Sequence, residues 1–247
     1  MKLTGNTILI TGGGSGIGQA LAVEFHKRGN TVIIAGRRQS ALDETVKANP
    51  GMHALVMDTG DAASIAAGVA KLTADFPALN AVINNAGIMR PEDLKQGDTA
   101  TAEATIATNL LGPIRLTAAL LPHLLKQPSA TVLTVSSGLA FVPMALTATY
   151  CATKAAIHSY SQSLRYQLKD TKVRVVEIIP PWVATELMGA KPTDPRAMPL
   201  DAYIAETMEL LGTDADEILV KNVLPLRNAA KGDEVGFFTK FNDSLPH

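Results

Sequence analysis

The stretch TILITGGGSGIGQALAVEF, residues 7–25, combines a short apolar strand, a glycine-rich turn and the first turns of a helix. Gly12, Gly16 and Gly18 allow a tight turn and a close backbone approach, and the N-terminus of the following helix favours an anion such as a pyrophosphate. The spacing is T-G-x-x-x-G-x-G rather than G-x-G-x-x-G. Because a strand precedes this turn and a helix follows it, a dinucleotide site is favoured over a plain surface loop.

The rest of the chain repeats this alternation of short apolar runs with longer segments rich in alanine and leucine. The predicted strands are 7–11, 31–36, 53–58, 81–87, 131–137 and 173–180, and the predicted helices are 16–29, 40–48, 62–75, 99–126, 150–170 and 200–211. Such alternation is typical of a parallel sheet covered by helices on both faces. We therefore predict one α/β domain over 1–247, with a doubly wound, Rossmann-type sheet. The proline-rich segment 186–211 is predicted to be a substrate lid.

Composition narrows the classes of partner. The chain has 22 basic and 23 acidic residues and no basic cluster interleaved with aromatic residues, so nucleic acid is not an expected partner. The first apolar run has only five residues, too few for a signal peptide or a membrane span. A single cysteine, Cys151, excludes an intramolecular disulfide, and the five histidines lack metal-ligand spacing. We predict a cytoplasmic protein with no metal and no membrane partner.

The second predicted strand ends in GRR, residues 36–38, where a carboxylate would bind the 2′-hydroxyl of an adenosine ribose. Gly36 offers no carboxylate, whereas the guanidinium groups of Arg37 and Arg38 can hold a 2′-phosphate through charge-assisted hydrogen bonds. The alternative is that both arginines are only the solvated start of a helix. The missing acid favours NADP(H) over NAD(H) as the cofactor.

Four further features follow the glycine turn in order: NNAG at 84–87, Asn109, Ser137 and YCATK at 150–154. With TGGGSGIG at 11–18, they resemble the short-chain dehydrogenase/reductase family, and the resemblance extends to about residue 185. It implies that the catalytic residues are Asn109, Ser137, Tyr150 and Lys154. Ser137 stands thirteen residues before the tyrosine, so the serine role falls on Ser137 rather than Ser136.

The residue types suit carbonyl reduction, which needs a hydride at carbon and a proton at the developing alkoxide. A free phenol, with a pKa of about 10, exchanges protons slowly near neutrality. An ammonium group one helical turn away, together with the positive charge of the oxidised nicotinamide, is expected to lower that pKa, so Tyr150 is the predicted acid/base. Ser137 would donate to the substrate oxygen. The resemblance adds a second role for Lys154, a hydrogen bond to the nicotinamide ribose.

Asn109 stands four residues before Pro113, which has no backbone N–H. The Asn109 carbonyl is therefore expected to lose its helical partner, and Gly112 makes a kink easier. The resemblance implies that this carbonyl holds a water linked to Lys154. The alternative is an ordinary helix-capping or surface asparagine.

The resemblance also implies the cofactor contacts. Asn84 and Ala86 are expected near the adenosine ribose, and Asp58 near the adenine amine, while Asn85 is expected to brace the strands. Asp61 is better placed than Asp58 to cap the next helix. The predicted cofactor-binding residues are Gly12, Ser15, Gly16, Ile17, Gly18, Arg37, Arg38, Asp58, Asn84, Ala86, Gly87, Tyr150, Lys154, Pro180, Val183 and Thr185.

After the sixth strand the chain reads IIPPWVATEL, residues 178–187. Pro181 stands where family members usually have glycine, and it stiffens the turn. The predicted substrate pocket comprises Leu139, Phe141, Met144, Trp182, Leu187 and Met188, with Tyr203 as a further candidate. These side chains are apolar and include no arginine, so they suit a hydrophobic ketone or aldehyde, although core packing is the alternative for each.

The leading prediction is an NADPH-dependent carbonyl reductase, reversible as an alcohol dehydrogenase. The alternatives are a non-catalytic NADPH sensor of the same fold and an isomerase or epimerase that cycles a bound cofactor. The stretches 136–143, 150–171 and 180–187 together resemble a branch of the family associated with cell-wall D-alanylation, which makes an accessory role there a further alternative. Leucines on more than one side of 99–126, together with the family habit, predict a homodimer or homotetramer.

Overall fold

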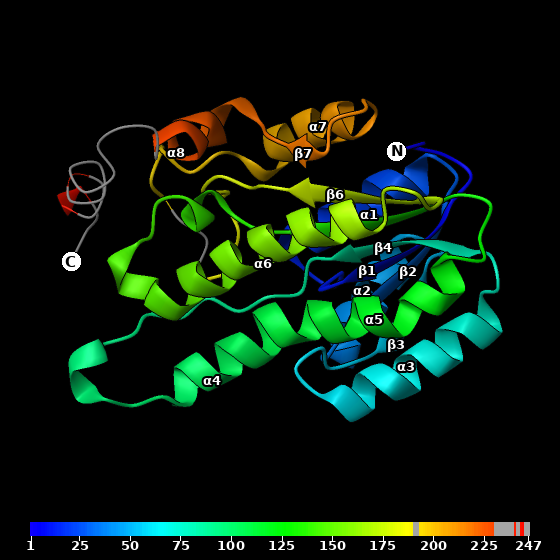
Figure 1. Ribbon diagram of the computed structural model, residues 1–247, viewed down its shortest axis with the longest axis horizontal. Helices are drawn as coiled ribbons and strands as arrows, with labels where there is room; N and C mark the ends of the chain where they lie inside the picture. The colour runs from blue at the N-terminus through cyan, green and yellow to red at the C-terminus, as the bar shows by residue number, and fades with distance from the viewer. Residues whose placement is uncertain (190–192, 230–239, 241–242, 245–247) are drawn as a thin grey trace.

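Seven parallel strands form one sheet in the order β3-β2-β1-β4-β5-β6-β7 (Figure 1). The computed structural model describes residues 1–189, 193–229, 240, 243 and 244. The strands are β1 (Thr7–Thr11), β2 (Thr31–Gly36), β3 (His53–Val56), β4 (Leu79–Asn84), β5 (Ala130–Val135), β6 (Val173–Ile178) and β7 (Glu217–Ile218). The predicted doubly wound parallel sheet is confirmed. Strand β7 was not predicted, because two residues carry no periodic signal.

Helices cover both faces of this sheet (Figure 1). On one face lie α1 (Gly16–Lys27), α2 (Gln39–Ala48) and α7 (Leu200–Leu211), and on the other lie α3 (Ala62–Asp75), α5 (Gly112–Leu124) and α6 (Ala148–Gln167). The remaining α-helices of the described residues are α4 (Ala100–Ile106) and α8 (Leu224–Ala229). Each face buries its own apolar core, so successive strand residues alternate between the two cores.

Strands β3 to β6 end two or three residues earlier than predicted. The small and polar residues after β4 and β5 therefore lie in loops at the carboxyl edge of the sheet rather than within it. The strand order reverses between β1 and β4, next to the glycine turn. Crevices at such a switch point are where open parallel sheets bind ligands.

The predicted helix 99–126 is interrupted by a π-helical turn, Ala107–Leu111, between α4 and α5. A side chain at Gly112 would bring a Cβ atom within 2.5 Å of the Thr59 carbonyl oxygen, so the turn needs glycine there. By length and hydropathy alone, Ala100–Leu124 would suffice to cross a membrane. Its leucines at 116, 120 and 124 are fully buried against the sheet, as in a helix of a protein core.

The predicted lid over 186–211 needs correction at its C-terminal end. Helix α7 packs against α1, and the side chains of Tyr203 and Leu211 are essentially fully buried. Tyr203 is therefore a core residue rather than a substrate contact, because its side chain has no exposed surface and belongs to the core that contains α1 and α7. Residues 190–192 of the predicted lid lie outside the described residues.

Candidate active site

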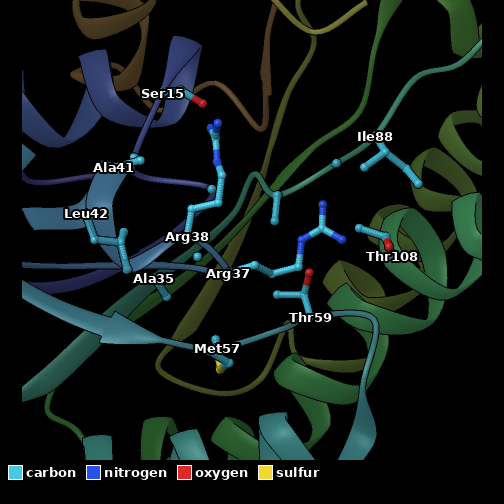
Figure 2. A pocket seen from close by; sticks show the side chains of 15 residues that line it. Ser15, Ala35, Arg37, Arg38, Ala41, Leu42, Met57, Thr59, Ile88 and Thr108 are labelled. Atoms are coloured by element: carbon cyan, nitrogen blue, oxygen red, sulfur yellow. The ribbon is translucent and has the colours of Figure 1, made fainter. Parts of the chain in front are cut away.

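A cavity opens at the carboxyl ends of β1 to β4 (Figure 2). It encloses about 680 Å³ of space, part of it open to solvent. Its lining residues are Gly12, Gly14, Ser15, Ala35, Gly36, Arg37, Arg38, Ala41, Leu42, Met57, Thr59, Ala86, Gly87, Ile88 and Thr108. The cavity therefore borders the glycine turn, which precedes the N-terminus of α1, and its size suits part of a dinucleotide.

Two guanidinium groups enter this cavity from the end of β2. Figure 2 shows the Arg38 guanidinium reaching toward Ser15, and that of Arg37 reaching toward Thr59 and Thr108. Both side chains are exposed, and neither has a hydrogen-bond or ion-pair partner among the residues that the structure describes. Uncompensated cations at a cavity wall attract an anionic group such as a phosphate.

Several predicted cofactor residues do not line the cavity. The Asn84 amide donates to Thr117 Oγ1 at 3.1 Å on the α5 side of the sheet, and Asp58 accepts from Gly60 N–H at 2.8 Å. Asp61 caps α3, as predicted. Asn85 braces β1 and β4 by donating to the Thr11 carbonyl at 2.9 Å. The remaining members of that set outside the cavity are Gly16, Ile17, Gly18, Tyr150, Lys154, Pro180, Val183 and Thr185.

Two of these residues still border the glycine turn. The Thr185 side chain would lie 3.7 Å from a Cβ atom placed on Gly16, so the loop after β6 reaches the turn. A Cβ atom on Gly18 would lie 2.4 Å from the Gly12 carbonyl oxygen, so Gly18 permits the close packing of α1 on the turn. The cavity residues that sequence reasoning missed include Met57, Thr59, Ile88 and Thr108. Their signal was weak: each follows or precedes a predicted site residue without carrying a motif.

Tyr150 and Ser137 meet at the start of α6 and the end of β5. The Ser137 hydroxyl is near enough to the Tyr150 phenol to lower its pKa, and the Leu139 N–H donates to Ser137 Oγ at 3.1 Å. Burial raises the pKa of the Tyr150 phenol above its usual range, and the neighbouring Ser137 hydroxyl offsets this rise only in part. The lowered pKa expected from Lys154 is therefore wrong for the polypeptide itself. Burial of the phenol is the largest cause of the shift, and the pKa is raised although an ammonium group lies one helical turn away.

Lys154 is also buried, 5% exposed, one helical turn after Tyr150. Its Nζ lies 5.5 Å from the centre of the Tyr150 ring and donates to the Val135 carbonyl at 2.7 Å. Burial lowers the pKa of the Lys154 ammonium to about 8, and the negative charge of Glu177 acts in the opposite direction. The structure therefore brings Ser137, Tyr150 and Lys154 together in a largely water-free site.

Asn109 lies in the π-helical turn and is 1% exposed, so it is neither a surface residue nor a helix cap. Its side chain bonds both backbone groups of Ile88, accepting from the N–H at 2.9 Å and donating to the carbonyl at 2.8 Å. Asn109 thus ties the cavity wall to the helix that packs on α6. A π-helical turn at such a position is frequent at functional sites.

Pro113→Ala tests whether this turn matters for activity. The alanine N–H can bond the Asn109 carbonyl in an α-helical pattern, which competes with the π-helical turn. We expect turnover several-fold lower while the melting temperature is equal or higher. Pro122→Ala, in the same helix but exposed, is the matched control and should leave the rate unchanged. Equal rates in both variants would remove the role assigned to the turn.

The predicted substrate residues fall into three groups. Met144 packs on Tyr150 and Cys151, with Leu139 at the edge of the same cluster. Trp182, Leu187 and Met188 are 43%, 43% and 44% exposed on the loop after β6. Arg196 lies 5.8 Å from the Trp182 ring, so this wall is less apolar than predicted, although Asp194 pairs with that arginine at 2.7 Å.

Phe141 does not belong to the predicted substrate pocket. Its ring contacts His158 edge-on at 4.8 Å between centroids, and the Arg227 guanidinium lies 4.7 Å from its centre. It also packs against the core that contains α1 and α7. The sequence placed it two residues from Leu139, but the short helical turn Gly138–Ala140 directs the two side chains into different clusters.

Comparison with known proteins gives the family. Residues 6–196 match the profile of the short chain dehydrogenase family. The chain belongs to the short-chain dehydrogenase family. It is 39% identical over 249 residues to the uncharacterized oxidoreductase DltE of Bacillus subtilis, with 98% of each chain covered. It is thus a DltE-like member of a family of oxidoreductases.

Solved structures agree on the fold. A short chain dehydrogenase from Burkholderia cenocepacia in complex with NADP superimposes with a TM-score of 0.85 at 22% identity, over 100% of both chains. A short chain dehydrogenase/reductase from Burkholderia phymatum in complex with NAD gives 0.84 at 20% identity, over 100% of this short-chain dehydrogenase and 99% of that chain. The two neighbours differ in cofactor, so shared fold does not choose between NAD and NADP.

Proposed function

We propose that this short-chain dehydrogenase is an NADPH-dependent carbonyl reductase, reversible as an alcohol dehydrogenase, that acts on a hydrophobic ketone or aldehyde. The observation that carries the proposal is that Ser137, Tyr150 and Lys154 lie buried next to one another. The unpaired Arg37 and Arg38 at the cavity support the choice of NADPH. The apolar contacts of Tyr150 with Met144 and its neighbours support a hydrophobic substrate.

NADPH, when bound, supplies the hydride for the carbonyl carbon. The Tyr150 hydroxyl donates a proton to the carbonyl oxygen as negative charge develops there, which balances the reduction to an alcohol. Ser137 also donates to that oxygen; because Leu139 N–H already occupies one lone pair of Ser137 Oγ, the hydroxyl is held in orientation. The Lys154 ammonium then stabilises the Tyr150 phenolate.

The raised pKa of Tyr150 sets the direction of the pH dependence. A phenol with a raised pKa stays protonated through neutral pH, so the proton donor for reduction is present there. Alcohol oxidation requires the phenolate and should therefore increase as the pH rises.

A spectrophotometric assay tests the proposal. NADPH absorbance is followed with aromatic and long-chain ketones and aldehydes, against short hydrophilic carbonyls and against NADH. Net NADPH oxidation with the hydrophobic members supports the proposal. Tight NADPH binding without turnover of any carbonyl would instead identify a sensor, and substrate conversion without net NADPH loss would identify an isomerase or epimerase.

We further propose that the protein is a homo-oligomer in the cytoplasm. The exposed faces of Ile106, Leu111 and Leu125, between 36% and 44% accessible, lie on the segment that includes α4 and α5. We propose that they pack against a second copy in a homodimer or homotetramer, which sedimentation would measure. The composition and single buried thiol favour a reducing, cytoplasmic setting.

A further inference from the structure

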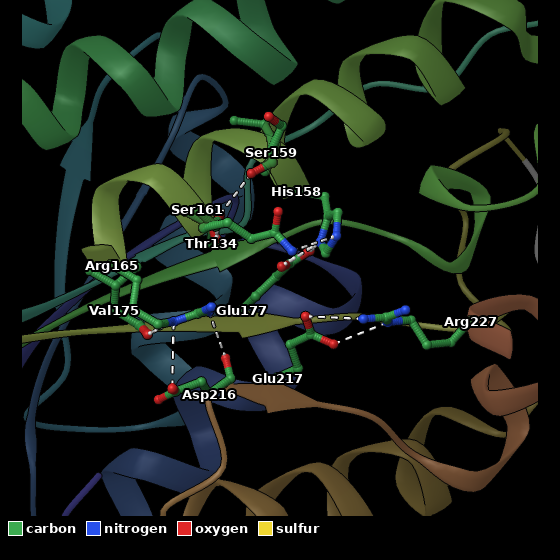
Figure 3. Close-up of polar contacts among 12 residues, drawn as sticks. Thr134, His158, Ser159, Ser161, Arg165, Val175, Glu177, Asp216, Glu217 and Arg227 are labelled. Atoms are coloured by element: carbon green, nitrogen blue, oxygen red, sulfur yellow. Dashed lines mark hydrogen bonds and ion pairs between the residues drawn. The ribbon is translucent and has the colours of Figure 1, made fainter. Parts of the chain in front are cut away.

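A row of polar side chains crosses the edge of the sheet beneath α6. Thr134 of β5 is in register with Glu177 of β6, which is in register with Glu217 of β7 (Figure 3). Their apolar neighbours along each strand face the opposite core, so the three side chains share the α6 face. Two carboxylates directly opposite each other on neighbouring strands repel, so each requires its own partner.

Each member of the row has a different partner. Thr134 Oγ1 bonds Ser161 Oγ at 2.6 Å, and the Arg227 guanidinium pairs with Glu217 at 3.1 Å. Glu177 is 0% exposed, and both of its oxygens lie within 3.1 Å of His158 Nδ1, the shorter contact being 2.8 Å. A carboxylate this deeply buried needs strong hydrogen bonds or a charge partner to remain ionised.

Both ring nitrogens of His158 have polar partners: Nδ1 contacts a Glu177 oxygen at 2.8 Å, and Nε2 lies 3.2 Å from the amide nitrogen of Gln162. Arg227, the cation nearest to Glu217, is already paired with that carboxylate. A further cation near Glu177 would therefore add to the stabilisation of its buried carboxylate.

Lys154 is the cation placed to do so. It lies one helical turn before His158 on α6, on the same face of the helix. Its Nζ donates to the Val135 carbonyl, in the strand next to β6, and Val135 adjoins the residue that pairs with Glu177. Lys154 and Glu177 are both buried, where charges interact more strongly than at a surface.

We propose that Glu177, oriented by His158, is a positioning residue for the active-site lysine: its buried carboxylate holds the Lys154 ammonium charged from behind the site. This assignment rests on the proposed function for its effect on catalysis, but the electrostatic link itself does not. Burial alone would favour a neutral amine, and a neutral amine would not stabilise the Tyr150 phenolate. The attraction of Glu177 raises the pKa of Lys154 against the larger effect of burial.

The groups that face this link come from four elements. Helix α6 contributes Tyr150, Lys154 and His158, β6 contributes Glu177, β7 contributes Glu217, and α8 contributes Arg227. The ligand atoms of His158, Glu177 and Glu217 all lie within 4.8 Å of one another. Because Arg227 neutralises Glu217, this group is organised as separate polar pairs and does not need a metal ion to balance it.

The direct test is the titration of Lys154 in the full-length protein labelled with [¹³Cε]lysine, with the Lys154 resonance assigned through Lys154→Met. The wild-type midpoint is expected near pH 8. Glu177→Gln removes the negative charge at nearly constant shape, so the Lys154 midpoint should shift to lower pH. Glu217→Gln makes the same chemical change one strand farther from Lys154, so it should shift the midpoint by less.

A second variant allows the same measurement if Glu177→Gln does not fold. The double change Glu177→Gln with His158→Gln leaves two amides that can bond each other without charge, and it should lower the Lys154 midpoint in the same way. An unshifted midpoint in the folded variants, or an equal shift in Glu217→Gln, would overturn the inference.

Steady-state kinetics distinguish a failure of this inference from a failure of the proposed function. Removing the negative charge of Glu177 lowers the pKa of Lys154, so in Glu177→Gln the alkaline limb of kcat for carbonyl reduction should move to lower pH. A merely structural loss would lower kcat without moving that limb, and this result would also overturn the inference. If no carbonyl is reduced by the wild type, the proposed function fails, while the NMR titration still decides the link between Glu177 and Lys154.

Discussion

Tyr150→Phe is expected to lower kcat for carbonyl reduction by about 10²- to 10⁴-fold, the usual contribution of a positioned general acid. Phenylalanine keeps the ring that packs on Met144 and Cys151 but removes the hydroxyl near Ser137. The variant should therefore fold and bind NADPH as the wild type does. Turnover is measured by NADPH absorbance, and binding by the fluorescence of the reduced cofactor.

Tyr160→Phe provides the matched control for that result. Tyr160 lies on the same helix, is half-buried, and packs against the core on the α6 face without contacting the site. It should keep the wild-type kcat. If Tyr150→Phe retains a rate within a few-fold of the wild type, or if both variants lose activity equally, Tyr150 is not the proton donor.

Motif residues were the most predictable part of the site because they carry backbone or side-chain chemistry that few other residues supply. The turn at 11–18 and the YCATK helix fall where they were expected, at the carboxyl edge of the sheet and at the start of α6. The incorrect predictions concern how deeply the Tyr150 phenol is buried and which way the Phe141 side chain points. Nothing local in the sequence reports that Phe141 turns toward His158, or that burial dominates the pKa of Tyr150.

The pair formed by His158 and Glu177 left only a partial signal in the sequence. The two residues are 19 positions apart, on a helix and a strand, so no spacing rule connects them. A glutamate inside the apolar run VRVVEIIP is nevertheless a signal, since a buried strand does not leave a carboxylate without a partner. The identity of the partner depended on the pairing of β6 with β5 and on the helix above them.

Replacing both Arg37 and Arg38 by alanine should weaken NADPH binding far more than NADH binding. A hydrogen bond to a charged group contributes about 1.5–3 kcal/mol, so each lost contact with a 2′-phosphate corresponds to roughly a tenfold to hundredfold rise in Kd. The single variants separate the two side chains, whose guanidinium groups point to opposite parts of the cavity (Figure 2). Lys47→Ala, an exposed charge on the helix that follows, controls for a general loss of positive charge.

Gly36→Asp tests the same cofactor preference in the opposite direction. A Cβ atom on Gly36 would meet only Leu42, at 3.6 Å, so a side chain fits at the end of β2 without displacing the backbone. A carboxylate there can accept from the 2′-hydroxyl of NADH and would repel a 2′-phosphate. Combined with Arg37→Ala and Arg38→Ala, it should reverse the ratio of the two Kd values in titrations with each cofactor. Equal weakening of both cofactors by the arginine variants would show that these cations bind the shared pyrophosphate instead, since that group cannot distinguish NADPH from NADH.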